Sequence, residues 1–138
     1  MASLREAIAA IQAHAITAGA REAPVDPPES NVGFPFAVCY PNNGLVKGLR
    51  VSARVDVVDL FLDVHLSRQN LPLNVQAALS FWEKFPDLII QDNILGGTVE
   101  NIDLMNDGMK FIFGNMSYAG IDTIGFRFTI QVKIRRSL

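Results

Sequence analysis

Three side chains that could bind a metal ion or take part in acid–base chemistry lie close together in the sequence: Asp59, Asp63 and His65. Their spacing places them on one face of an extended segment. Residues four apart on a strand are separated by roughly 13 Å, too far for both carboxylates to share one ion. Only Asp63 and His65 could share a site, and a third ligand would have to come from elsewhere. We therefore interpret the three as a polar row that faces solvent or another subunit.

Other reactive residue types do not form a catalytic pattern. Cys39 is the single cysteine, which excludes an internal disulfide and a thiolate zinc site, and its apolar neighbours predict an unreactive thiol. Gly96-Gly97 lacks the spacing of a phosphate-binding loop, and the serines and threonines lack a nucleophile-elbow motif. We expect neither an enzyme nor a cofactor.

Composition predicts one domain, residues 1–138, that is long enough to bury a core. Hydrophobic residues make up 49% and charged residues 19%, where about a quarter charged is usual. Either a dense core or apolar surface covered by partner subunits would explain this. The net charge of −2 gives no sign of a DNA- or membrane-binding surface. The absence of an export signal and of a long apolar run predicts a soluble protein of the cytoplasm.

The last segment is the clearest element. Its apolar and polar residues alternate without interruption, which predicts a strand with one buried face and a basic end at Lys133, Arg135 and Arg136. The apolar members are Phe126, Phe128, Ile130, Val132 and Ile134.

Two helices are predicted to cover this strand. The first runs from Leu4 to Ala18, with Ser3 and Glu6 at capping-box spacing. The second runs from Leu71 to Phe85, with Ala78, Trp82 and Phe85 on its buried side. Pro86 is expected to break it, with room for one further turn from Pro86 to Asp92.

Further strands are predicted before and after the second helix. The first of them, Phe36–Tyr40, should end in a turn at Pro41–Gly44. A long strand, Leu45–Leu66, changes the parity of its apolar residues at Val57-Val58, which predicts a β-bulge. Gly96-Gly97 leads into a strand through Val99, Ile102 and Leu104, and a hairpin turn at Asn106–Gly108 precedes the strand from Met109 to Phe113. The predicted order is α-β-β-α-β-β-β, an α+β domain with a mostly antiparallel sheet flanked by two helices.

A proline-rich loop, residues 21–35, interrupts this pattern. A connection of this length without its own secondary structure is usually functional or mobile. It is either a flexible linker or an arm that orders against another protein, and its prolines lower the entropy cost of ordering.

This order of elements resembles the tail terminator proteins of long-tailed bacteriophages over nearly the whole chain. The resemblance lies in the helix Leu4–Ala18, the strand Phe36–Tyr40, the Leu-Gly-Gly-Thr-Val turn at 95–99 and Tyr118-Ala119-Gly120-Ile121. It implies a virion protein that assembles in the cytoplasm into a homohexameric ring at the head–tail junction. The ring would cap the tail tube, stop its polymerisation, attach the neck or head-completion protein, and let DNA pass without specific binding.

The resemblance carries over no catalytic residues. From the loop, the hairpin turn, the polar row and the basic end, we expect the contacts with the tube or with neighbouring subunits to come from Pro24, Asp26, Pro27, Pro28, Glu29, Asp59, Asp63, Asn106, Asp107, Arg135 and Arg136. Asp59 and Asp63 would face a neighbour or the bore. Two alternatives stay open: a neck adaptor or tail-completion protein at the portal, and a small metal-dependent nuclease that uses Asp59, Asp63 or His65.

Overall fold

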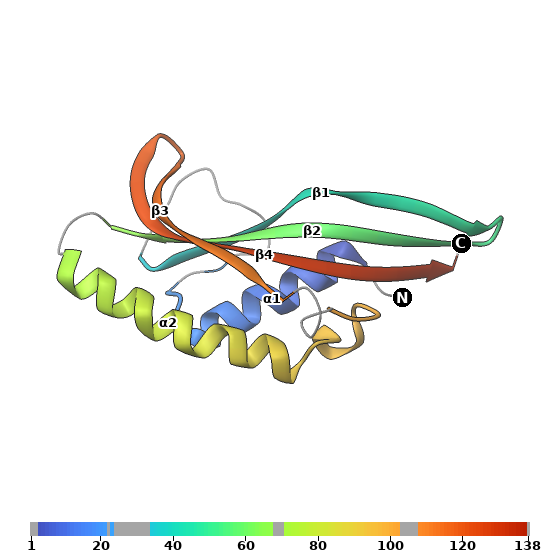
Figure 1. Ribbon diagram of the computed structural model, residues 1–138, viewed down its shortest axis with the longest axis horizontal. Coiled ribbons are helices and arrows are strands. Elements are labelled where there is room, and N and C mark those ends of the chain that lie inside the picture. The colour runs from blue at the N-terminus through green and yellow to red at the C-terminus, as the bar shows by residue number, and fades with distance from the viewer. Residues whose placement is uncertain (1–2, 22, 24–33, 68–70, 103–107, 138) are drawn as a thin grey trace.

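A four-stranded antiparallel sheet runs the length of the molecule, and both long helices lie on one side of it (Figure 1). The computed structural model describes residues 3–21, 23, 34–67, 71–102 and 108–137. The strand order is β1-β2-β4-β3, so β1 and β3 form the two edges. The predicted α+β class is confirmed. The elements are α1 (Leu4–Ala18), β1 (Phe36–Arg50), β2 (Ala53–Leu66), α2 (Leu71–Gln91), the 3-10 helix η1 (Leu95–Gly97), β3 (Lys110–Tyr118) and β4 (Ile121–Ser137).

The core lies between the helices and the face of the sheet that they cover. The alternation predicted for β4 is confirmed, because its five apolar residues are all buried there. In the register of the sheet Leu62 lies opposite Phe128 and Leu60 opposite Ile130, so β2 adds a second apolar row. Helix α2 adds Phe85, whose ring centroid lies 5.3 Å from that of Phe128. Burying each such side chain contributes roughly 1.5–3 kcal/mol, so this layer dominates the stability of the fold.

The ends of the helices differ in how well the sequence predicts them. The side chain of Ser3 accepts a hydrogen bond from the Glu6 amide at 3.1 Å, as the capping-box spacing predicts. The predicted break at Pro86 is wrong, because α2 continues to Gln91. A proline inside a helix removes one backbone hydrogen bond. Phe85 and Ile89, on either side of Pro86, are both fully buried, and their packing offsets that loss.

The first two strands form one long hairpin, which corrects two predictions. The chain does not turn at Pro41–Gly44, since β1 continues to Arg50 and reverses at Val51-Ser52. The register shift lies in β1, between Pro41 and Asn43, whereas β2 pairs with β4 without a shift. An edge strand tolerates both a proline and a bulge. The parity change at Val57-Val58 instead marks where the buried apolar residues move from one face of β2 to the other: Val55 is buried on the face away from the helices and Leu60 on the helix side.

The strand predicted after Gly96-Gly97 is wrong, and the observed order is α-β-β-α-β-β. Both glycines have positive φ, and the chain forms η1 there. Only one bridge, Asn101 to Lys133, joins this segment to β4 within the described residues, although the Glu100 amide also donates to the Lys133 carbonyl at 2.7 Å. Val99 and Ile102 turn into the core, which takes the segment out of the sheet. Leu104 lies outside the described residues.

The sheet extends past the helices at one end. Figure 1 shows the β1–β2 turn and the end of β4 beyond α1 and α2, near the label C. We call residues 45–52 the β1–β2 tip. Its apolar side chains remain in water, with exposed fractions of 63% for Leu45, 64% for Val46, 43% for Leu49 and 100% for Val51.

Candidate functional site

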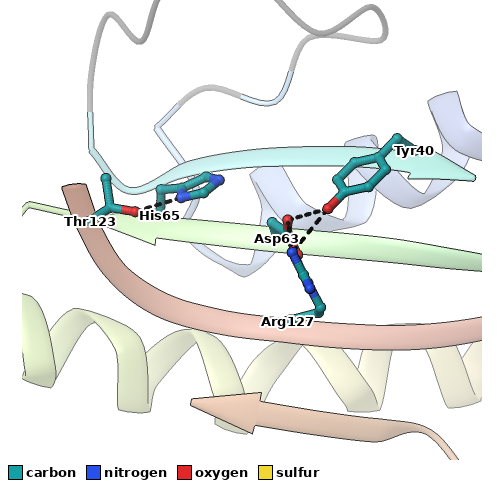
Figure 2. A network of polar contacts seen from close by, with 5 residues as sticks. All are labelled: Tyr40, Asp63, His65, Thr123 and Arg127. Atoms are coloured by element: carbon teal, nitrogen blue, oxygen red, sulfur yellow. Dashed lines mark hydrogen bonds and ion pairs between the residues drawn. The ribbon is translucent and has the colours of Figure 1, made fainter. Parts of the chain in front are cut away.

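The face of the sheet opposite the helices, which we call the outer face, carries a polar network that joins three strands (Figure 2). Tyr40 comes from β1, Asp63 from β2 and Arg127 from β4, and the register places Asp63 directly opposite Arg127. The odd-numbered residues of β2 point to this face because the even-numbered Leu60, Leu62 and Val64 face the core. The prediction that Asp59, Asp63 and His65 share one face of the strand is consistent with this alternation.

Arg127 and Asp63 form a bidentate ion pair. The Arg127 Nε donates to Asp63 Oδ1 at 2.8 Å, and Nη2 donates to Oδ2 at 3.1 Å. The Tyr40 hydroxyl donates to the same Oδ2 at 2.6 Å. The side chain of Asp63 is 5% exposed and that of Arg127 is 35% exposed. The guanidinium also lies 4.5 Å from the ring centroid of Phe61, which adds a cation–π contact.

These contacts favour fixed charges over proton transfer. Burial, followed by the hydrogen bond to Asp63, raises the pKa of Tyr40 to about 12. The hydrogen bond to Asp63 raises the pKa of Arg127 above its ordinary value. A general acid or base needs a pKa near the working pH. The network is therefore suited to locking the register of β1, β2 and β4, and less suited to catalysis.

His65 lies on the same face but makes a separate contact. Its Nδ1 is 2.7 Å from Thr123 Oγ1, and its ring packs near Phe36 and Tyr118, with centroids 6.1 and 5.5 Å away. The residue is 1% exposed, and its Nε2 has no hydrogen-bond partner among the residues that the structure describes. Burial lowers the pKa of His65 below its ordinary value, although the charge of Asp63 acts in the opposite direction. The folded protein therefore favours the neutral imidazole.

This burial predicts a loss of stability in mild acid. The unfolded chain binds a proton on His65 near the ordinary value of about 6.5, whereas the folded chain binds it only at lower pH. The contribution is thus fully present above that pH and falls as the pH drops below it. Urea denaturation at pH 7 and pH 5 should show a lower midpoint at pH 5. In His65→Phe the difference should shrink, and an unchanged difference would contradict the assignment to His65.

The remaining predicted site residues are placed as follows. Asp59 accepts a hydrogen bond from Gln131 at 3.0 Å, and Arg135 lies 3.4 Å from Glu100. Arg136 lies opposite Arg54 in the sheet. No group of three metal-ligating side chains occurs in the part of the chain that is described. Most of the proline-rich loop (22 and 24–33) and most of the hairpin turn (106 and 107) lie outside the described residues, and so do their predicted contacts Pro24, Asp26, Pro27, Pro28, Glu29, Asn106 and Asp107.

Cys39 is buried on the helix side of β1. Burial, with a smaller contribution from the charge of Asp63, raises the pKa of its thiol to about 12. A thiol of this kind is almost entirely protonated near neutral pH, and the thiolate is the reactive form. The position therefore fits the predicted role of a packing residue.

An apolar groove lies between α2 and the start of β3, and sequence reasoning missed it. It has a volume of about 290 Å³ and is lined mainly by Trp82, Pro86, Ile90, Met109, Phe111 and Phe128. Trp82 was predicted to be buried but is 40% exposed, because the narrower stripe of Ala78, Phe81, Phe85 and Ile89 fills the core. Its ring contacts Phe111 edge-on, at 5.8 Å between centroids. We call this surface the Trp82 groove.

Comparison with known proteins leaves the function to be inferred from these surfaces. The sequence matches no protein-family model, and no curated protein matches it. In the described ranges, neither helix combines the length and the apolar character needed to cross a bilayer. Two features of the structure therefore bear on the function: the hydrogen-bonded polar network on the outer face, and the exposed apolar surfaces at the sheet edges.

Proposed function

We propose that this protein is a structural component of a bacteriophage virion. In this proposal it caps the completed tail tube as a homohexameric ring, stops tail polymerisation and provides the attachment surface for the neck or head. The protein has no enzymatic role, and it resides in the tail at the head–tail junction.

The observation that carries the proposal is apolar surface at both edges of the sheet. On the β1 edge the β1–β2 tip leaves large apolar side chains in water, and on the β3 edge Phe111, Ile112 and Phe113 are 47%, 65% and 46% exposed. Exposed apolar patches of this kind mark interaction surfaces. An open edge strand also offers backbone groups to a neighbouring chain. A subunit with one such edge on each side is suited to a closed ring.

The polar network supports the same function. Because Asp63 is buried and held by Arg127, it serves to lock the sheet of the subunit rather than to offer a free charge to the bore. Asp59 is only partly buried and remains the candidate of the two for a neighbour or for the bore. A slightly acidic subunit also suits the passage of DNA, since like charges discourage binding.

The proposal is tested by adding the purified protein to tail tubes that lack a terminator. Negative-stain imaging should show six-copy rings at one end of each tube, and tubes with rings should not lengthen when more tube protein is supplied. Tubes incubated without the protein set the baseline. Continued elongation, or binding along the side of the tube, would contradict the proposal. A twelve-copy ring on the portal would instead favour the neck adaptor.

A further inference from the structure

We infer that the β1–β2 tip of one copy docks into the Trp82 groove of a second copy. The inference rests on the proposed function only in expecting that successive contacts of this kind close into a ring. It names the two surfaces through which the copies meet. The occupant is this chain's own tip, and three observations lead to that choice.

The first observation is that the tip exposes several large apolar side chains to solvent. Four large apolar residues lie among polar or small ones at the end of the β1–β2 hairpin, and each is at least 43% exposed: Leu45, Val46, Leu49 and Val51. The hairpin extends beyond both helices, and neither α1 nor α2 reaches its turn (Figure 1). Covering them would remove from water the apolar surface that folding leaves exposed.

The second observation is the complementary charge of the two surfaces. The β1–β2 tip carries Lys47 and Arg50 and contains no acidic residue. On α2, Glu83 and Asp87 each follow a groove residue by one position. Because a helix turns about 100° per residue, both carboxylates border the groove on its solvent side, and both residues are exposed. An apolar, basic tip thus matches an apolar groove with an acidic border.

The third observation is the position of the two surfaces. The tip belongs to the hairpin that carries the β1 edge, and the groove lies against β3, the opposite edge. The rigid sheet holds them apart, so one copy cannot fill its own groove. A contact between two different surfaces of identical chains is heterologous, and it leaves one tip and one groove available for further copies.

A mixing experiment tests this contact. Val51→Asp alters the tip at a fully exposed position, and Ile90→Lys places a positive charge in the groove at a position that is 57% exposed. Each variant alone should lose self-association by more than about tenfold in sedimentation analysis. An equimolar mixture should form one-to-one dimers and nothing larger, because only the tip of Ile90→Lys and the groove of Val51→Asp remain intact.

Leu73→Lys is the matched control. Leu73 is 66% exposed and lies on the same helix, about half a turn away from the Trp82 stripe, so this variant should assemble like the natural protein. Trp82 is the only tryptophan, and its fluorescence reports directly on the groove. If the Ile90→Lys partner also carries Trp82→Phe, the emission of the mixture comes from the intact groove alone and should shift to shorter wavelength when the dimer forms.

Three results would overturn the inference: a natural protein that stays monomeric up to millimolar concentration, a mixture that stays monomeric, or a single variant that assembles like the natural protein. The proposed function fails separately. If the mixture forms dimers and the natural protein assembles, but tail tubes continue to grow in its presence, the contact stands and the tail-capping function does not.

Discussion

Replacing Gly125 by alanine is expected to destabilise the fold by at least about 3 kcal/mol. A Cβ built on Gly125 would overlap the carbonyl oxygen of Val64 and lie 2.9 Å from its carbonyl carbon. Both atoms belong to the backbone of β2, so a side-chain rotation cannot relieve the contact. The β2–β4 ladder would have to separate beside His65, which lies opposite Gly125. The change in the urea midpoint of unfolding measures the effect.

Gly114 is the matched control for this prediction. It pairs with Gly125 across β3 and β4, yet a Cβ built on it meets nothing within 4 Å. Gly114→Ala should therefore leave the midpoint nearly unchanged, or raise it slightly, because alanine reduces the freedom of the unfolded chain. Equal losses in the two variants would show that general strand propensity, not the close approach to Val64, explains the result.

Replacing Arg127 by methionine is expected to cost about 2–4 kcal/mol. Methionine keeps much of the apolar stem but leaves the buried Asp63 carboxylate without its cation and without two hydrogen bonds. The expected loss is below that of a fully enclosed pair because the Arg127 side chain is 35% exposed and solvent screens part of the interaction. Chemical denaturation at pH 7 measures the change in the free energy of unfolding.

Lys133→Met provides the comparison for the ion pair. Lys133 lies 4.0 Å from Glu100, and both side chains are about two-fifths exposed, at 41% and 39%. Exposed pairs of this kind contribute about 0–1 kcal/mol.

The triple variant with Arg127→Met, Asp63→Leu and Tyr40→Phe should recover much of the stability that Arg127→Met loses, since no charge is then left buried. A triple variant less stable than Arg127→Met would contradict this account.

The sequence was most informative where one face of an element is covered throughout. Strand β4 alternates because its helix-side residues are buried from Phe126 to Ile134, and its prediction is confirmed. The sequence was misleading in β2, where the buried apolar residues change from one face of the strand to the other. The parity change in β2 was interpreted as a bulge, but Val55 and Leu60 are buried on opposite faces of a regular strand. The spacing of apolar residues in a sequence indicates which side chains are buried, and it indicates the backbone conformation only indirectly.

The contacts of the site depend on pairings that a single sequence does not specify. Asp63 was singled out for its type and spacing, but its partner Arg127 is 64 residues away, and only the β2–β4 register joins them. Trp82 illustrates the same limit on a helix. Its spacing fits the apolar stripe of α2, yet the width of the surface that the sheet can cover decides that Phe81 and Phe85 are buried while Trp82 remains at the border.

The two irregularities of β1 have a consequence for the protein in a crowded cell. The register of β1 shifts between Pro41 and Asn43 and again between Gly48 and Arg50, so its regular pairing with β2 is divided into two short stretches, residues 36–41 and 43–48. Fibrous aggregates grow by adding strands to long, flat, uncharged edges. Two short stretches separated by a register shift, one of them carrying Lys47, are a poor template for such growth. The chain can therefore leave apolar side chains exposed along this edge and still resist amyloid-like stacking.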